Sequence, residues 1–263
     1  MLLACAAIGL GMVVVMLSGW AFQARVGNAG WVDVFWTFGT GLGCALGALA
    51  AGPVLWRRAL AAALVLFWSV RLGAYIAGRV ASGAEDARYA RMRAESGAAF
   101  QRRMLLLVLV QGPFSATLAI AVLYAARQPD PAFRPWDALG IALALGAICG
   151  EALADRQMRR FRANPANRGK VCDTGLWGFS RHPNYLFEII GWCAYPALGV
   201  ATHQPWSLLS LLAPALMYLT LRYASGVPPL EAAMMASRGE AYQRYQARTG
   251  AILPRPSALW RKP

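Results

Sequence analysis

Seven apolar stretches of about twenty residues each follow one another along the chain, separated by polar connections. A helix needs about 20 consecutive apolar residues to cross the hydrocarbon core of a bilayer. The pattern therefore predicts an all-α, polytopic membrane protein with seven transmembrane helices. The predicted spans are Leu2–Phe22, Trp31–Ala51, Ala59–Gly78, Met104–Ala126, Trp136–Ala154, Tyr185–Thr202 and Trp206–Leu221.

Basic residues concentrate in two long connections, 79–103 and 155–184, and in the tail 222–263. The positive-inside rule assigns these three segments to the cytoplasmic side. With seven spans, the N-terminus is then expected outside and the C-terminus in the cytoplasm, although Arg57 and Arg58 fall on the wrong side. The first span has no preceding basic segment, so we expect it to be retained rather than cleaved as a signal peptide. No repeat or linker is evident, and residues 1–263 are predicted to form one domain.

Composition agrees with this interpretation: 58% of the residues are hydrophobic and only 14% are charged, while the net charge is +14. Soluble domains carry about 25% charged residues. The excess of arginine therefore indicates membrane topology and phosphate binding rather than nucleic-acid binding. The five cysteines are scattered and do not cluster with the two histidines, so neither a metal site nor a disulfide framework is predicted.

Polar side chains recur at helical spacing inside the apolar spans, where ionisable groups are costly and are functional by default. Gln111 precedes Gly112-Pro113, which is expected to kink the fourth span, and is a candidate for the same interior. In each polar stripe the alternative is a structural ion pair or an interfacial belt. The three stripes are Asp33, Trp36, Thr37 and Thr40; Trp68, Arg71, Tyr75 and Arg79; and Glu151, Asp155, Arg159 and Arg162.

The stretch from Gly175 to Glu188 is the strongest candidate for a functional segment. Its sequence is Gly-Leu-Trp-Gly-Phe-Ser-Arg-His-Pro-Asn-Tyr-Leu-Phe-Glu. Ser180 and Pro183 are typical of a helix start, and Asn184 and Glu188 then share one face. A carboxylate in this position needs a partner or a ligand.

These groups are expected to converge on the cytoplasmic half of the bundle, next to a basic rim. Arginine forks and lysine on such a rim suit several phosphate oxygens. An apolar substrate could reach the site from lipid, and a charged cofactor from the cytosol. The expected rim residues are Arg159, Arg162, Lys170 and Arg181.

The Gly175–Glu188 stretch, together with Glu85-Asp86-Ala-Arg-Tyr89 and the tail from Gly239 to Thr249 and Pro254, resembles the bacterial branch of the steroid 5-alpha-reductase family. That family shares a membrane superfamily with the sterol reductases and the isoprenylcysteine carboxyl methyltransferases. The resemblance covers about Asp33 to Pro254 and is more specific for the superfamily than for the reaction. It implies a seven-helix protein of a bacterial inner membrane that binds NADPH from the cytosolic side and reduces a conjugated C=C bond.

The resemblance also implies roles for individual residues. Asp33 occupies the place of a catalytic glutamate, and Trp68 that of a tyrosine that grips the substrate carbonyl. Trp36 and Gln111 are expected to contact substrate. Glu151 stands where an Asn would, and Lys170 where an Arg would. The residues expected to bind the cofactor are Arg71, Tyr75, Glu151, Asp155, Arg159, Arg162, Lys170, His182, Asn184, Tyr185, Glu188 and Arg222.

In the expected reaction, hydride arrives at the beta carbon of an enone, and negative charge develops on its carbonyl oxygen. A donor must therefore be preorganised at that oxygen. A protonated Asp33, kept neutral by desolvation, or the indole N–H of Trp68 could serve. The expected substrate is a 3-oxo-4-ene steroid or a similar apolar enone, with membrane lipids as surroundings and no obligate protein partner or nucleic acid.

Two other functions remain open on the sequence. One is a SAM-dependent methyltransferase for a prenylated or lipid-like thiol, built on the same scaffold. The other is a non-enzymatic lipid or sterol transporter or scaffold. The arginine-rich rim favours a dinucleotide over SAM, because SAM carries a sulfonium cation and only one carboxylate.

Overall fold

The computed structural model of the chain describes residues 1–83, 85–200 and 205–255. These residues are almost entirely helical, and their one extended pairing is an isolated parallel bridge between Ser180 and Gly250. The elements are α1 (Leu2–Val26), α2 (Trp31–Leu49), α3 (Leu55–Ala81), α4 (Ala87–Ser96), η1 (Gly97–Ala99), α5 (Phe100–Arg127), α6 (Pro135–Ala163), η2 (Pro165–Asn167), α7 (Leu176–Phe179), α8 (Pro183–Gly199), η3 (Pro205–Leu211), α9 (Leu212–Leu219), η4 (Thr220–Ala224), α10 (Val227–Arg238) and α11 (Glu240–Arg248).

Six helical segments in the described part of the chain are long and apolar enough to cross a membrane, which makes the chain a multi-pass membrane protein. The sequence predicts a seventh span at Tyr185–Thr202. Its counterpart, α8, has only 17 residues, and the predicted end at Thr202 lies outside the described residues. The six segments are Leu2–Val26, Trp31–Leu49, Leu55–Ala81, Ala87–Arg127, Pro135–Ala163 and Pro205–Arg238.

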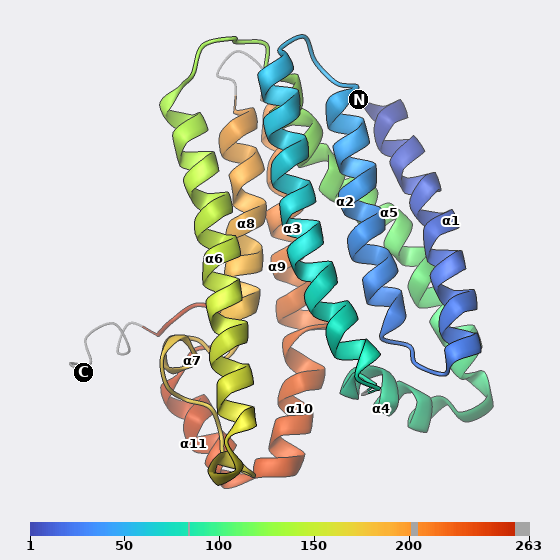
Figure 1. The fold of residues 1–263 in the computed structure, drawn as a ribbon, viewed down its shortest axis with the longest axis vertical. Helices are drawn as coiled ribbons and strands as arrows, with labels where there is room; N and C mark the ends of the chain where they lie inside the picture. The colour runs from blue at the N-terminus through green and yellow to red at the C-terminus, as the bar shows by residue number, and fades with distance from the viewer. Residues whose placement is uncertain (84, 201–204, 256–263) are drawn as a thin grey trace. The chain divides into compact units, whose positions relative to one another are not determined.

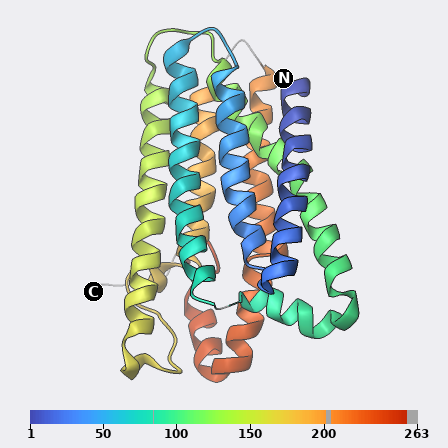
Figure 2. The same cartoon turned by 45° about the vertical axis from the view of Figure 1, so that its right-hand side comes forward.

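The residues of the chain group into two compact units. Unit 1 consists of Met1–Ile141 and Ala194–Ala213, and unit 2 of Ala142–Cys193 and Pro214–Pro263. In unit 1, α2 packs along α3, and α1 packs along α5, as the two views in Figures 1 and 2 show.

Glycines allow the helices of unit 1 to approach one another closely. A Cβ added at Gly41 would lie 2.2 Å from the Ser69 side chain, and one at Gly112 would lie 2.9 Å from the Gly9 carbonyl oxygen. Membrane helices gain little from the hydrophobic effect between themselves, so close backbone packing at small residues stabilises their association. Gly112 directly precedes Pro113, and α5 continues through this proline as one helix.

A buried ion cluster closes one end of unit 1. The Arg57 guanidinium, 2% exposed, donates to Asp137 Oδ1 at 2.7 Å and to the Asp130 carbonyl oxygen at 2.6 Å. Arg134 also pairs with Asp137, at 2.9 Å, and donates to the carbonyl oxygen of Val200. The guanidinium of Arg57 is thus fully engaged in hydrogen bonds within the protein. This explains why an arginine at this position need not act as a topology signal.

In unit 2, the segment between α6 and α8 is fastened to α6. The indole N–H of Trp177 donates to the Ala154 carbonyl oxygen at 3.1 Å, and the Leu176 N–H donates to Gln157 Oε1 at 3.0 Å. The turn before α7 requires Gly175, because its φ is 59° and an added Cβ would lie 2.7 Å from the Gln157 side chain. The segment 164–182 is therefore an ordered part of unit 2 rather than a loose loop.

Candidate functional site

Asp33, predicted to be a catalytic acid, is a paired carboxylate in unit 1. Its Oδ2 accepts from Arg88 Nη2 at 2.9 Å, and its Oδ1 accepts from the Tyr89 hydroxyl at 2.7 Å. Both carboxylate oxygens of Asp33 are thus already engaged with donors, one from Arg88 and one from Tyr89. The proton-donating role predicted for Asp33 stays a prediction, and the structure adds Arg88 and Tyr89 as its hydrogen-bond partners.

Arg88 and Tyr89, the partners of Asp33, belong to a segment that the carboxylates of Glu85 and Asp86 fix in place. Glu85 Oε1 accepts from the Ala29 N–H at 3.0 Å and from Arg93 at 2.8 Å, and Asp86 caps the start of α4. Burial alone would raise the pKa of Asp86, but its bonds to Arg88 outweigh burial and lower that pKa. The Glu85–Tyr89 motif thus acts as a clasp across one end of unit 1.

The predicted substrate residues lie within the helices of unit 1. The Trp36 indole N–H donates to Ser115 Oγ at 3.1 Å, and its ring meets Trp68 edge-on at a centroid distance of 6.1 Å. Trp68 is 7% exposed. Gln111 Oε1 is buried and has no hydrogen-bond donor among the residues described. These groups form an aromatic region with one acceptor available to a polar group. Arg71 follows Trp68 on α3 by about one turn and Tyr75 by about two turns. Both side chains are partly buried.

In unit 2, one face of α6 carries the predicted acidic and basic residues. Glu151 and Asp155 are each 5% exposed, and Met158 and Arg162 continue this face at helical spacing. Met158 and Arg162 line a cavity of about 510 Å³ that also takes in the segment after α6 and one side of α10. The predicted face of α6 therefore leads into a real cavity.

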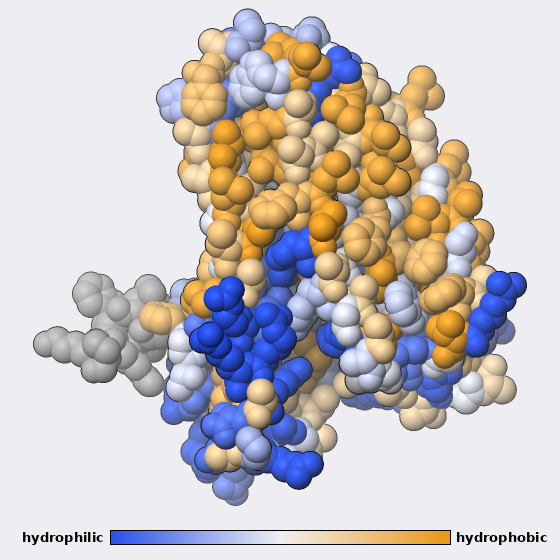
Figure 3. All heavy atoms as spheres, in the orientation of Figure 1, coloured by the Kyte–Doolittle hydropathy of each residue, from blue (hydrophilic) through white to orange (hydrophobic). Residues whose placement is uncertain are grey.

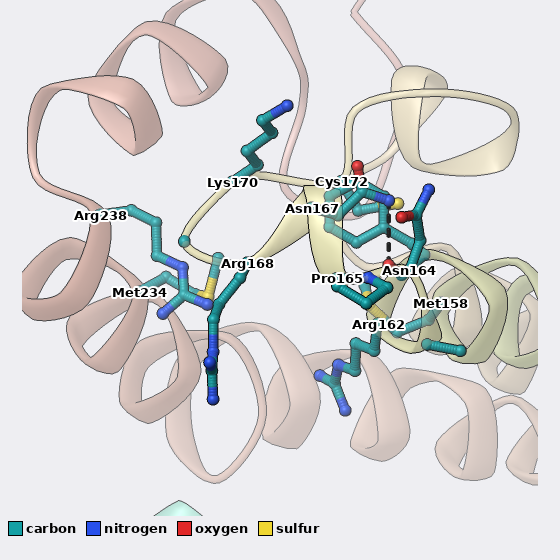
Figure 4. A pocket seen from close by; sticks show the side chains of 13 residues that line it. Met158, Arg162, Asn164, Pro165, Asn167, Arg168, Lys170, Cys172, Met234 and Arg238 are labelled. Atoms are coloured by element: carbon teal, nitrogen blue, oxygen red, sulfur yellow. Dashed lines mark hydrogen bonds between the residues drawn. The ribbon is translucent and has the colours of Figure 1, made fainter.

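Four cationic side chains line this cavity: Arg162, Arg168, Lys170 and Arg238 (Figure 4). None of the described residues in its lining is acidic. Arg162 and Arg168 point to the same side in Figure 4, whereas Lys170 extends to the other. Arg238 Nε is buried and has no acceptor among the residues that the structure describes. A buried donor without an acceptor is costly, so the cavity is suited to an anion.

The remaining lining of the cavity is largely apolar. It includes Met158, Phe161 and Met234, together with the buried thiol of Cys172. Burial raises the pKa of Cys172 above its ordinary value, so this thiol stays protonated near neutral pH and adds no negative charge. A ligand that combines phosphate oxygens with a flat apolar group matches both parts of the lining.

The Arg-His-Pro turn is tied to the tail of the chain. Glu231 Oε1 accepts from Arg181 Nε at 2.7 Å and from His182 Nε2 at 3.2 Å, while Gln246 donates to Oε2 at 2.7 Å. The His182 ring stacks on Tyr185 at 5.2 Å. Burial lowers the pKa of His182 below its ordinary value, against the opposing effect of Glu231. Arg181 is therefore part of an internal ion pair and does not line the basic cavity.

The predicted pair Asn184 and Glu188 lies on α8, one turn apart. The Trp192 indole N–H donates to Glu188 Oε1 at 2.9 Å, and Glu188 is 8% exposed. Asn184 Oδ1 is a buried acceptor with no donor in the described part of the chain. Arg222 belongs to η4, a π-helical turn, and its guanidinium lies 5.0 Å from the centre of the Tyr223 ring. Single π turns are frequent at functional sites.

The predicted site residues divide between the two units. Of the four residues predicted for the basic rim, Arg162 and Lys170 line the cavity, whereas Arg159 and Arg181 do not. Unit 1 holds Asp33, Trp36, Trp68, Arg71, Tyr75 and Gln111; unit 2 holds Glu151, Asp155, Arg159, Arg162, Lys170, His182, Asn184, Tyr185, Glu188 and Arg222.

Three important residues were not predicted as site residues. Arg168 and Arg238 complete the basic cavity, and Glu231 holds Arg181 and His182. For Arg168, the dense run of basic residues after α6 was a usable signal. Arg238 and Glu231 lie far along the chain from their neighbours, and no spacing within the sequence points to them.

Nearly all of these residues lie within a region that matches a known protein family. A family model described as a protein of unknown function, DUF1295, matches residues 19–249. The chain belongs to the DUF1295 family. No curated protein and no solved structure matches it.

The DUF1295 match extends over both units. It includes the clasp of Asp33, the whole lining of the basic cavity, and the Arg-His-Pro turn with its partner Glu231. It ends at Thr249, one residue before the Gly250 carbonyl oxygen that accepts from the Arg181 N–H at 2.9 Å. The features described above thus lie almost wholly within the family's shared region.

Proposed function

We propose that this DUF1295 protein is an NADPH-dependent membrane reductase that reduces the conjugated C=C bond of an apolar enone, such as a 3-oxo-4-ene steroid. The observation that carries the proposal is the basic cavity of unit 2, with four cationic and no acidic residues in its described lining. The DUF1295 family is associated with steroid 5-alpha-reductase-like proteins, and the motifs of the chain resemble theirs.

The residues present fit the cofactor. NADPH brings three phosphate groups, and arginine forks bind phosphate oxygens in pairs. Arg162, Arg168 and Arg238 would hold these groups, and the Arg238 Nε donor would gain the acceptor that it lacks among the described residues. The sulfonium cation of SAM would instead meet four positive charges. The cavity therefore favours the reductase over the methyltransferase.

Bound NADPH would supply hydride, and the chain would orient the reactants. Asn184 Oδ1 is a buried acceptor suited to the N–H of a carboxamide, next to the buried Glu188 carboxylate on the same face of α8. The oxygen of the enone needs a donor. Because both Asp33 oxygens already accept hydrogen bonds, we assign the candidate donor role to the indole N–H of Trp68. The apolar substrate would enter from lipid, with the cavity on the cytosolic side.

Measuring the melting temperature with and without ligand tests whether the protein binds NADPH. A ligand that binds only the folded state raises its melting temperature. We expect NADPH to stabilise the purified wild-type protein and SAM to leave it unchanged. The double variant Arg168→Gln/Arg238→Gln should lose most of the NADPH effect, whereas Arg244→Gln, an exposed arginine on α11, should keep it.

Product analysis tests the reaction. With NADPH and a 3-oxo-4-ene steroid, mass spectrometry should detect a product that has gained two hydrogen atoms. Stabilisation by SAM and not by NADPH would replace the proposal with the methyltransferase. Stabilisation by neither ligand in folded protein would favour a lipid-binding function without catalysis.

A further inference from the structure

Helix α6 has an exposed face that is apolar over most of its length and ends in two arginines. Successive exposed residues on this face are Ala142, Leu145, Cys149, Leu153, Arg156 and Arg160, at steps of three or four. Residues at these steps form one stripe along a helix. Arg156 lies two positions from Met158, and Arg160 lies two positions from Arg162, so these two cavity residues project from the side of α6 opposite the stripe.

The stripe changes character along its length. Leu145 and Leu153 are 44% and 45% exposed, and such leucines on a membrane helix face lipid chains. One turn beyond Leu153 the stripe becomes cationic with Arg156 and Arg160. In the view of Figure 3, hydrophobic residues cover the upper part of α6, and hydrophilic residues gather over its lower end.

The length of α6 places this change at a membrane boundary. Its 29 residues span about 43 Å at 1.5 Å per residue, whereas the hydrocarbon core measures about 30 Å. One end of α6 must therefore extend into the headgroup layer. The end that carries Arg156 and Arg160 is the one whose exposed face becomes polar.

The segments of unit 2 that follow α6 also expose apolar side chains. The Trp177 indole holds α7 against the Ala154 carbonyl oxygen. Phe179, at the end of α7, is 47% exposed. Leu253, which follows the segment paired with Ser180–His182, is 63% exposed. Exposed apolar groups beside arginine are typical of the interface between acyl chains and headgroups.

Neither Arg156 nor Arg160 has an internal partner among the residues that the structure describes. This distinguishes them from Arg57, Arg88 and Arg181, which are all paired with carboxylates. Guanidinium groups at successive turns of a helix can bind a phosphodiester from two sides. A phosphate on an acyl-bearing glycerol would also place its chains along Leu153 and Leu145.

We propose that Arg156 and Arg160 form a binding site for the headgroup of an anionic phospholipid, whose acyl chains lie along the exposed apolar stripe of α6. The site is independent of the proposed reductase activity, because it uses the face of α6 away from the cavity. It gives the protein a preference for membranes that contain anionic lipid.

Native mass spectrometry from nanodiscs tests the site. Wild-type protein, Arg156→Gln/Arg160→Gln and the charge-matched control Arg102→Gln/Arg244→Gln would be released from nanodiscs of phosphatidylcholine with phosphatidylglycerol. We expect wild type and control to retain one phosphatidylglycerol. The Arg156/Arg160 variant should retain about thirtyfold less, because it loses two arginines at the headgroup itself, each contributing about 1 kcal/mol, whereas the control arginines lie outside the stripe. Unchanged elution and melting temperature would show that the variant is folded.

Four results would overturn the proposal. Equal retention by the Arg156/Arg160 variant would remove the site. Equal loss in the control variant would reduce the effect to general charge attraction. Displacement of the lipid by dilute inorganic phosphate would show an anion site rather than a lipid site. Retention of phosphatidylcholine at the same level would likewise exclude recognition of an anionic headgroup.

Discussion

His182 shows how one residue can be held neutral next to a carboxylate. Burial lowers its pKa, and the hydrogen bond from Nε2 to Glu231 raises it without reversing the shift. Arg181 contributes to the lowering, because it is a cation that shares the same Glu231 oxygen. The Arg-His-Pro turn is thus stabilised by one carboxylate that serves two side chains.

The stability of this turn should depend on pH through His182. The folded-state pKa of His182 lies below the unfolded value of about 6.5, so its contribution to stability is present above that pH and is lost as pH falls. NMR titration of His203→Gln protein, in which His182 is the remaining histidine, should give a midpoint below about 6.5. Glu231→Gln should lower it further. A midpoint above that of free histidine would contradict the assigned burial.

Residue roles were the least predictable part of the site. The sequence places Asp33 on a polar stripe of α2, but its partners Arg88 and Tyr89 lie in another segment, and they engage both of its carboxylate oxygens. The pattern of one helix can show that a carboxylate needs a partner. It cannot show which arginine supplies it, because the choice is made by tertiary packing.

At the scale of elements, two glycines near α6 both have positive φ but differ in the space available for a side chain. Gly175 has φ 59° and lacks room for a Cβ beside Gln157, whereas Gly169 has φ 77° and open space around it. Both positions disfavour other residues by about 1–2 kcal/mol, but only Gly175 adds a steric clash.

Substitution by alanine should separate these effects. Gly175→Ala should lower the free energy of unfolding by about 1–3 kcal/mol more than Gly169→Ala, because overpacking adds to backbone strain. Denaturant unfolding of both variants in the same detergent measures the difference. Equal losses would mean that the contact between the turn and Gln157 does not constrain the segment.

Most helices were predictable because hydrophobic length alone sets them. The predicted spans Leu2–Phe22 and Ala59–Gly78 fall within α1 and α3, which extend further at one or both ends. The connection 79–103 was expected to be a loop, yet it contains α4, capped by Asp86. α4 is short and strongly basic, so its helical pattern is weak beside that of the spans.

For the whole molecule, the number of spans decides the topology. Seven spans place the termini on opposite sides, and six place them on the same side. The described residues contain six candidate spans, and α8, with 17 residues, is not among them. We expect α8 to cross together with the residues that follow it, as the apolar run to Thr202 predicts.

Reporters at both termini test this expectation. A fluorescent protein fused after Arg255 should fold and fluoresce in the cytoplasm, and a tag before Met1 should react with a reagent that cannot cross the membrane. Protection of both termini on one side would establish an even number of spans. The same result would reverse the assignment of either the N-terminus or the basic tail.

Only some of the residues that line the basic cavity could be predicted, because the others come from distant parts of the chain. Arg162 and Lys170 lie close together in the chain, so a local run of charge revealed them. Arg238 comes from α10 and reaches the cavity only when the tail is folded. Helices α6, α8 and α9 each contribute residues to both units.

The wide turn η4 has a consequence for comparisons among relatives. Its five residues, Thr220–Ala224, wind with one more residue per hydrogen bond than the α9 helix before them. A homologue with one residue fewer here would close the same stretch as an ordinary α-helical turn, because the wide turn holds one extra residue. Alignments of relatives should therefore place a one-residue gap within this turn, since a gap elsewhere would pair Arg222 with a side chain that faces another way.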